Sequence, residues 1–256
     1  MSTGVLMYCF NTPDTAYHRL AERAIALVKK NLNLPVTLVT DRETYNSIAQ
    51  DNNVNYKIID KTSTNNFRFY RGKNVPWYNM ERANAYDHTP YDCTLLLDCD
   101  YFCYTSNLLE LTKTDYDFLL HDKVNDITGL NRIQTRLEST LPIVWATVVM
   151  FKRTERVKMI FDMIQYVQTN YEHFRNLYRI RFRNYRNDYA FAIALHQLSG
   201  QLKNNTFIPS PMNMLPHEYD VLECTDRGIV YKYNNKVNLL VDTDVHVLDK
   251  ELIHVG

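Results

Sequence analysis

Residues 94–102 constrain the fold of this chain more than any other part of its sequence. An apolar run over 95–97 ends abruptly in two aspartates, Asp98 and Asp100, which a single residue separates. An apolar run that stops at charged residues is typical of a buried strand that surfaces at the edge of a parallel sheet. Ligand sites in open α/β sheets lie at these carboxyl ends. Two carboxylates there predict a hard divalent cation, Mg²⁺ or Mn²⁺, with positions left open for phosphate.

The competing interpretation of Asp98 and Asp100 is a solvated turn with two surface aspartates, because the Asp-X-Asp spacing alone is common. The apolar strand directly before the pair favours the metal site.

Strand patterns alternate with helical patterns along the chain, which predicts an α/β fold with a mostly parallel sheet and helices on both faces. The expected strands are 5–10, 36–40, 54–59, the run before Asp98, 116–121 and 144–151, with a hairpin over 229–241. The expected helices begin at Thr12-Pro13-Asp14, cover 43–50 and 77–86, follow a Thr154 cap, and run from Asp188 to Leu198 before Gly200. Residues 61–75 are expected to form a polar loop.

Composition narrows the class of protein. The 256 residues contain no Pro/Gly/Ser-rich linker or internal repeat, which predicts one domain over 1–256. With six glycines, the chain has no P-loop or G-x-G-x-x-G pattern. No signal-like N-terminus is present, and no apolar run approaches the roughly 20 residues of a membrane span. The five cysteines lie on apolar segments, which predicts reduced thiols and a cytoplasmic protein.

The chain resembles glycosyltransferases of the GT-A fold. Residues 97–100 match the DxD motif of that fold, residues 5–10 and 35–41 match its first two strands, and a histidine segment follows near the C-terminus. The resemblance implies a Rossmann-like nucleotide-binding half over 1–104 and an acceptor half with a metal-ligand segment over 105–256. It also implies a nucleotide-sugar donor, in first place a UDP-sugar, whose diphosphate is held by Mn²⁺ or Mg²⁺.

The histidine near the C-terminus is the second feature that carries this resemblance. Residues 244–250 resemble the GT-A segment in which a histidine completes the metal shell and a lysine contacts the diphosphate, which implies those roles for His246 and Lys250. Neutral imidazole is a suitable third ligand beside Asp98 and Asp100, and the lysine ammonium is a compact charge for phosphate. The alternative is an ordinary strand histidine between two valines.

Asp188 resembles the acidic residue at a helix start that faces the acceptor in this fold. A helix N-terminus favours a negative charge, so the carboxylate would serve as a base or as an anchor for the acceptor. The alternative is an ordinary helix cap.

Nucleotide contacts are expected at the ends of the first two strands and on the helix before the DxD strand. The resemblance implies this role for Tyr8, Asn11, Asp41 and Arg82, together with Asp98 and Lys250. Asp41 is also explained as a helix cap, and Arg82 as part of a solvated helix face. Trp145 and Thr147 stand where many members of the fold carry Asn and Gly beside the donor sugar, which leaves the identity of the sugar open.

Residues 174–186 form a basic segment in a chain of zero net charge. The segment contains five arginines interleaved with tyrosine and phenylalanine and no acid, namely Arg175, Arg179, Arg181, Arg183 and Arg186. Arginine forks contact phosphate and aromatic rings stack on bases, so the segment predicts nucleic-acid binding beside the acceptor side. The alternative is a solvated helix face with aromatic residues packed beneath it.

Bacteriophage enzymes glycosylate hydroxymethylated bases in phage DNA, and a modified base is therefore the first expectation for the acceptor, with the host cytoplasm as the location. A polysaccharide, lipid-linked glycan or protein acceptor remains an alternative, as does a nucleotide-binding module without turnover. The sequence gives neither the stereochemistry of transfer nor the oligomeric state.

Overall fold

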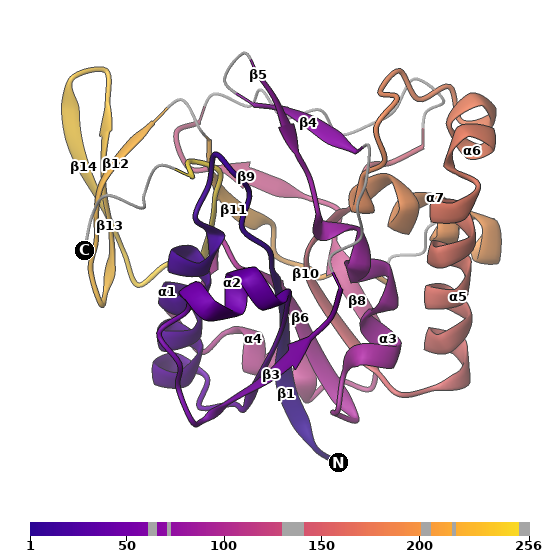
Figure 1. Cartoon of the computed structure of the whole chain (residues 1–256), viewed down its shortest axis with the longest axis horizontal. Coiled ribbons are helices and arrows are strands. Elements are labelled where there is room, and N and C mark those ends of the chain that lie inside the picture. Colours follow the sequence, from indigo (N-terminus) through magenta and orange to yellow (C-terminus); the bar gives the residue numbers. More distant parts are fainter. Residues whose placement is uncertain (61–65, 71–72, 130–140, 201–205, 217–218, 251–256) are drawn as a thin grey trace.

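The central element of the fold is a six-stranded sheet in the order β3-β2-β1-β6-β10-β8 (Figure 1). The computed structural model describes residues 1–60, 66–70, 73–129, 141–200, 206–216 and 219–250. Only β10 runs antiparallel to its neighbours, so the sheet is mostly parallel, as predicted. The strands are β1 Thr3–Cys9, β2 Val36–Thr40, β3 Val54–Ile58, β6 Cys93–Asp98, β8 Phe118–His121 and β10 Trp145–Lys152.

Both faces of this sheet are covered, because successive side chains of a strand point to opposite sides. On β1, Val5 and Met7 belong to one buried cluster, and Leu6 and Tyr8 belong to the other. The first cluster includes residues of α1 Tyr17–Asn31 and α4 Leu108–Thr112. The second includes residues of η1 Asn79–Asn84, α3 Ala85–His88, α5 Glu155–Thr169, α6 Tyr171–Leu177 and α7 Asn187–Ser199. The predicted helix–sheet–helix layering is therefore confirmed.

The strand order reverses beside β1, and this reversal places the site. The chain proceeds from β1 to β2, passes through α2 Arg42–Ser47 to β3, and returns to the other side of β1 as β6. The crevice outside the carboxyl ends of strands at such a switch point is the usual ligand site of open α/β sheets. Tyr8 lies opposite Asp98 in the β1–β6 pairing, so the ends of both strands meet there.

A second sheet brings the end of the chain to this crevice. Its order is β7-β15-β11-β9, with β7 Tyr101–Phe102, β9 Val124–Asp126, β11 Met212–Leu215 and β15 Val245–Val247. His246 pairs with Tyr101, and the Val247 N–H donates to the Asp100 carbonyl at 2.9 Å. The late histidine segment therefore lies directly beside the Asp-X-Asp turn.

A three-stranded antiparallel sheet near the C-terminus lies at one side of the molecule (Figure 1). It consists of β12 Asp220–Cys224, β13 Gly228–Tyr233 and β14 Lys236–Val241. Asn234 and Asn235 connect the last two strands with φ angles of 47° and 61°, the left-handed conformations of a tight hairpin turn. The hairpin predicted over 229–241 is confirmed.

Three local predictions were wrong. Helix α1 begins at Tyr17 and not at Thr12, because Thr12 and Thr15 exchange backbone hydrogen bonds of 3.0 and 3.3 Å in a local turn. The expected helix over 77–86 begins as the 3₁₀ helix η1 and becomes α-helical only at α3. The expected loop over 61–75 contains the hairpin of β4 Phe67–Tyr70 and β5 Lys73–Pro76, while 61–65 and 71–72 lie outside the described residues.

Within the described part of the chain, every helix is too short or too polar to cross a lipid bilayer.

Gly4 tests the packing near the amino end of β1, a central strand of the sheet. A Cβ atom at this position would lie 2.4 Å from the ring of Tyr91, whose hydroxyl is 2.9 Å from Thr37 Oγ1. We expect Gly4→Ala to lower the free energy of unfolding by about 1–3 kcal/mol, because the ring must move and lose that bond. Denaturant unfolding measures this loss, and the same substitution in a Tyr91→Leu background should cost less. An unchanged stability of Gly4→Ala would contradict the packing described.

Candidate active site

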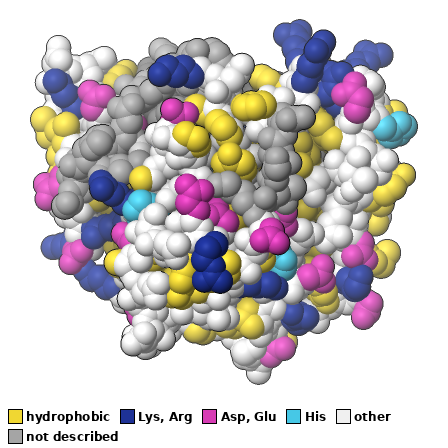
Figure 2. Space-filling model, in the orientation of Figure 1, with side chains coloured by type: hydrophobic (Ala, Val, Ile, Leu, Met, Phe, Trp, Pro, Cys, Tyr) yellow, Lys and Arg dark blue, Asp and Glu magenta, His cyan; other side chains and the backbone are white. Residues whose placement is uncertain are grey.

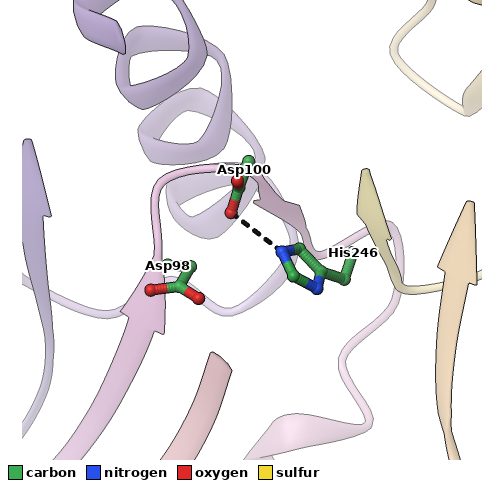
Figure 3. Close-up of side chains that lie close together, drawn as sticks. All are labelled: Asp98, Asp100 and His246. Carbon is green, nitrogen blue, oxygen red and sulfur yellow. Dashed lines mark ion pairs between the residues drawn. The ribbon is translucent and has the colours of Figure 1, made fainter. Parts of the chain in front are cut away.

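Three potential metal ligands converge at the carboxyl end of β6. Asp98 ends the strand, Asp100 lies in the turn that follows, and His246 comes from β15 (Figure 3). One ligand atom from each residue lies within 4.8 Å of the others. Asp98 and Asp100, which are two positions apart, therefore lie together with His246, which comes almost 150 positions later. The resemblance to GT-A enzymes implied the same three residues, and their role as metal ligands stays a prediction.

The donor set fits a divalent cation. His246 Nε2 lies 3.2 Å from Asp100 Oδ1, and its Nδ1 lies 3.4 Å from Thr147 Oγ1. Asp100 Oδ1 is buried and accepts no hydrogen bond from the described residues, so the approach of the imidazole leaves this oxygen unsatisfied. Donation from Nδ1–H to the threonine would direct the Nε2 lone pair toward the carboxylates, which is the tautomer that a metal ligand requires.

The two carboxylates have opposite electrostatic environments. Burial raises the pKa of Asp98, although the Arg82 guanidinium partly offsets this effect and Asp100 adds to it. For Asp100, burial also acts to raise the pKa, but the nearby charges of Lys250 and His246 outweigh it and lower the pKa well below its usual range. Lys250 Nζ contacts Asp100 Oδ2 and donates to the Val247 carbonyl at 2.9 Å. Asp100 is thus held as an anion.

Arg82 joins three elements beneath the site. Its side chain is 1% exposed, and Nη1 donates to Asp98 Oδ1 at 2.8 Å. Nη2 donates to backbone carbonyls on β6 and β10, those of Leu96, Ala146 and Thr147. Arg82 therefore holds the Asp98 carboxylate in position. The alternative interpretation, in which Arg82 is part of a solvated helix face, is wrong.

The cluster lies in the wall of a cavity of about 700 Å³. A volume of this size is within the usual range for small-molecule sites. The wall is built from the ends of β1 and β6, the start of β10, the β4–β5 hairpin, η1, the segment before α7 and the C-terminal strand region. Of the predicted site residues, it contains Tyr8, Arg82, Asp98, Asp100, Asp188, His246 and Lys250.

Asp188 is fixed in the first turn of α7 by two donors. The Ala146 N–H donates to Oδ1 at 3.0 Å, and Arg186 Nη2 donates to Oδ2 at 2.9 Å. The negative charge of Asp188 also acts to raise the pKa of Asp98, so the carboxylates of Asp98 and Asp188 interact electrostatically. The Asp188 side chain is 16% exposed and points to the cavity wall, whereas the helix cap position belongs to Arg186.

The remaining nucleotide candidates have local structural partners. Asp41 is the N-cap of α2, where Oδ1 accepts from the Thr44 N–H at 2.8 Å. Asn11 donates its N–H to Thr44 Oγ1 at 2.8 Å, and its Oδ1 accepts from the His18 N–H at 3.0 Å. Neither Asn11 nor Asp41 is among the described residues that line the cavity, and their roles in nucleotide binding stay predictions. Tyr8 does line it, and its hydroxyl lies 3.0 Å from His88 Nδ1.

The arginine segment divides into two groups. Arg175 bonds to both carboxylate oxygens of Glu172 at 3.0 and 2.7 Å, and Arg186 pairs with Asp188. Arg179, Arg181 and Arg183 are exposed on the irregular chain between α6 and α7. The interpretation as a helix face is therefore wrong beyond Leu177, where α6 ends.

Sequence reasoning missed several residues of the cavity wall, among them Asn79, Asn74 and Pro76. Asn79 Nδ2 lies 3.4 Å from Asp98 Oδ1, and Asn74 and Pro76 belong to the β4–β5 hairpin. The only sequence signal for Asn79 is its position three residues before Arg82 on a short helix. Trp145 and Thr147, noted for their bulk, also line the cavity.

Comparison with known proteins supports the fold. No family model matches the chain, and no curated protein matches it. The solved structure of mouse xyloside xylosyltransferase 1, apo form, is similar with a TM-score of 0.50 and 11% identity, over 81% of this chain and 84% of that one. This chain has the GT-A fold.

A second similar structure is that of the galactosyltransferase LgtC in complex with donor and acceptor sugar analogs. Its TM-score is 0.47 at 12% identity, over 75% of this chain and 70% of that one.

The buried ion pair of Lys250 and Asp100 predicts a pH-dependent stability. In the metal-free protein at pH 7, we expect Lys250→Met to lower the free energy of unfolding by about 3–5 kcal/mol, because Asp100 loses its cation. The lowered pKa of Asp100 means that this stabilisation is present above the ordinary aspartate pKa of about 3.9 and is lost as the pH falls below it. The stability gap between the two proteins should therefore stay constant from pH 7 to about pH 5 and narrow as the pH falls from about 5 toward 2.

Urea unfolding in EDTA measures this gap. The control is Lys113→Met, which removes an exposed pair with Glu110 and should change stability by less than about 1 kcal/mol. A gap that stays constant with pH would contradict the ionic origin of the effect.

Proposed function

We propose that this protein is a metal-dependent glycosyltransferase that transfers a sugar from a nucleotide-sugar donor to an acceptor hydroxyl. The observation that carries the proposal is the cluster of Asp98, Asp100 and His246 at the switch point of a GT-A sheet, in the wall of a cavity of about 700 Å³. Carboxylates and an imidazole suit Mn²⁺ or Mg²⁺, and the open side of such an ion suits a diphosphate.

Each side chain in and around the cluster has its own role in this proposal. Asp98, Asp100 and His246 would hold the ion, which when bound stabilises negative charge on the departing diphosphate. Arg82 keeps Asp98 in position, and Lys250 supplies a second positive charge at the same place. A UDP-sugar is the proposed donor, with its nucleotide near the ends of β1 and β2, where Tyr8, Asn11 and Asp41 lie.

Asp188 is the proposed anchor for the acceptor. Its two fixed hydrogen bonds set the direction of the carboxylate at the cavity wall. The remaining lone pairs of these oxygens would accept the proton of an acceptor hydroxyl, orienting it or removing its proton.

The test of the donor chemistry is release of free nucleotide from a panel of nucleotide sugars. With Mn²⁺ we expect turnover, and we expect Asp100→Asn and EDTA each to reduce it by at least about a hundredfold, because several kcal/mol of charge stabilisation are lost. The matched control is Asp162→Asn, an exposed aspartate paired with Lys158 on α5, which should keep full activity. Full turnover in EDTA or in Asp100→Asn would overturn the proposed metal dependence.

We propose a modified base in DNA, carrying a hydroxymethyl group, as the acceptor. The support is the position of Arg179, Arg181 and Arg183, which are exposed in the segment that leads to Asp188. Arg183 and the 56%-exposed Phe182 also line the cavity. Figure 2 shows Lys and Arg side chains gathered at the upper right, where Figure 1 places α6 and the chain that follows it.

A base inside a duplex cannot reach a cavity, so the proposal requires a flipped or single-stranded base. Phe182 packs against Tyr189 with ring centroids 6.3 Å apart and an interplanar angle of 24°, which leaves a supported aromatic face near the arginines. A phage origin and a place in the host cytoplasm belong to this same proposal.

The DNA proposal predicts salt-sensitive binding. Replacing Arg179, Arg181 and Arg183 by glutamine should weaken DNA binding and reduce the slope of log affinity against log salt by roughly two to three, with donor hydrolysis unchanged. Replacing Lys113, Lys158 and Lys232 by glutamine removes the same charge elsewhere and should leave the affinity close to that of wild type.

Fluorescence anisotropy across a salt series measures both triple variants. If the protein shows no salt-sensitive DNA binding and glycosylates a free glycan, a polysaccharide, lipid-linked glycan or protein takes the place of DNA. If no nucleotide sugar is turned over although nucleotide binds, the alternative of a non-catalytic module holds.

A further inference from the structure

The three-stranded sheet near the C-terminus has one packed face and one exposed face. On the packed face, Ile229 is fully buried, and Tyr231 and Leu240 pack against the core. On the other face, β14 exposes three apolar side chains at alternating positions. Val237 is 64% exposed, Leu239 is 62% exposed, and Val241 is 44% exposed. Hydrophobic side chains are visible at the left edge of Figure 2, on the side where Figure 1 places this sheet.

The backbone of the same three residues faces an open edge. In the described residues β14 pairs only with β13, so β14 is an edge strand. The Asp242 N–H donates to the Arg227 carbonyl at 2.9 Å, which fixes the alternation of the antiparallel ladder. Residues 236, 238 and 240 therefore bond to β13, and the N–H and C=O groups of Val237, Leu239 and Val241 point to the open edge.

The other edge strand of the sheet, β12, has features that prevent pairing with another chain, and β14 lacks them. Strand β12 has a register shift between Val221 and Glu223, and it carries the acids Asp220 and Glu223. Bulges and charges on an edge strand prevent pairing with another chain. Strand β14 has regular pairing throughout and a single charge, Lys236, at its first position.

We propose that β14 is a dimerisation strand that pairs antiparallel with β14 of a second copy of this chain. The sequence of the strand is self-complementary about Leu239. A two-fold axis there places Leu239 against itself, Val237 against Val241, and Lys236 beside Asp242 of the second copy, the residue that follows the strand with a φ of 47°. Every edge-facing backbone group of the three apolar residues then takes part in the ladder, and their side chains form one continuous apolar row. The Val241 carbonyl, which already accepts from Thr243 Oγ1 at 2.8 Å, would use its second lone pair.

The charges around the sheet favour a second copy over a lipid surface. Residues 220–242 contain three basic side chains, Arg227, Lys232 and Lys236, and four acidic ones, Asp220, Glu223, Asp226 and Asp242. A sheet face that binds anionic lipid needs an excess of basic residues, which this segment lacks. The match of Lys236 to Asp242 needs an antiparallel partner of the same sequence. Asp242 also pairs with Arg227 of its own chain through Oδ2 at 3.2 Å.

The first test is the oligomeric state by sedimentation velocity over a concentration series. We expect a monomer–dimer equilibrium in the micromolar range, because a single strand and its apolar row make a small interface. Leu239→Glu should weaken the dimer by about a hundredfold or more, since like charges then meet on the two-fold axis. Met159→Glu is the matched control, because Met159 is 57% exposed on α5, and it should leave the dimer intact.

The second test is the register, by disulfide cross-linking with copper phenanthroline as oxidant. Opposed residues that share hydrogen bonds have Cα atoms about 5.5 Å apart, within the range a disulfide spans. Leu239→Cys should therefore give a covalent dimer, and Val237→Cys should give one only together with Val241→Cys. The wild-type protein is the control for cross-linking through Cys224, which is the one native cysteine among the described residues that is not buried.

A protein that is monomeric at 100 µM, or a dimer that Leu239→Glu leaves unchanged, would overturn the proposal. Cross-linking of Val237→Cys alone would overturn the register. A monomer that sediments with vesicles of mixed neutral and anionic lipid would assign the apolar row to a membrane surface instead. Both tests are independent of glycosyl transfer, so their outcome does not depend on the proposed function.

Discussion

The half-buried carboxylate of Asp98 at the end of β6 and the buried carboxylate of Asp100 in the turn that follows are the constraint on which the rest of this structure depends. Such a pair is tolerated only when positive charge reaches it, because burial and mutual repulsion both oppose ionisation. Arg82 reaches Asp98 from η1, while Lys250 and His246 reach Asp100 from the other end of the chain. The requirement therefore ties η1, β6, β10 and β15 together at the crevice where the strand order reverses.

Much of the fold could be predicted because its signals are local. Buried strands appear as apolar runs. The predicted helix cap at Thr154 is confirmed, because its side chain accepts from the Val157 N–H. The predicted helix end at Gly200 is confirmed by the φ of 66° at this residue. The clustering of Asp98, Asp100 and His246 could also be predicted, since the carboxyl end of a central strand is where an α/β fold places ligands. The resemblance to GT-A enzymes then supplied the third residue.

The features that could not be predicted depend on contacts between segments that are far apart in the sequence. Nothing local shows that Arg82 is buried, because its burial requires carbonyl groups from β10, more than 60 residues later. The Thr12-Pro13-Asp14 sequence has every feature of a helix start, yet Thr12 and Thr15 bond to each other and delay the helix to Tyr17. The β4–β5 hairpin is polar enough to be taken for a loop, and the Asn184 side chain donates to the Phe67 carbonyl beside it.

The measurement that tests the metal centre most directly is pulsed electron paramagnetic resonance on Mn²⁺ added to the protein, with and without UDP. An imidazole nitrogen coupling that disappears in His246→Ala, and a phosphorus coupling that appears when UDP is added, are the predicted results. They would place the ion between His246 and the diphosphate, at the Asp98–Asp100 turn. Bound Mn²⁺ without nitrogen coupling, or binding that Asp100→Asn leaves unchanged, would contradict the assignment of this cluster as the metal centre.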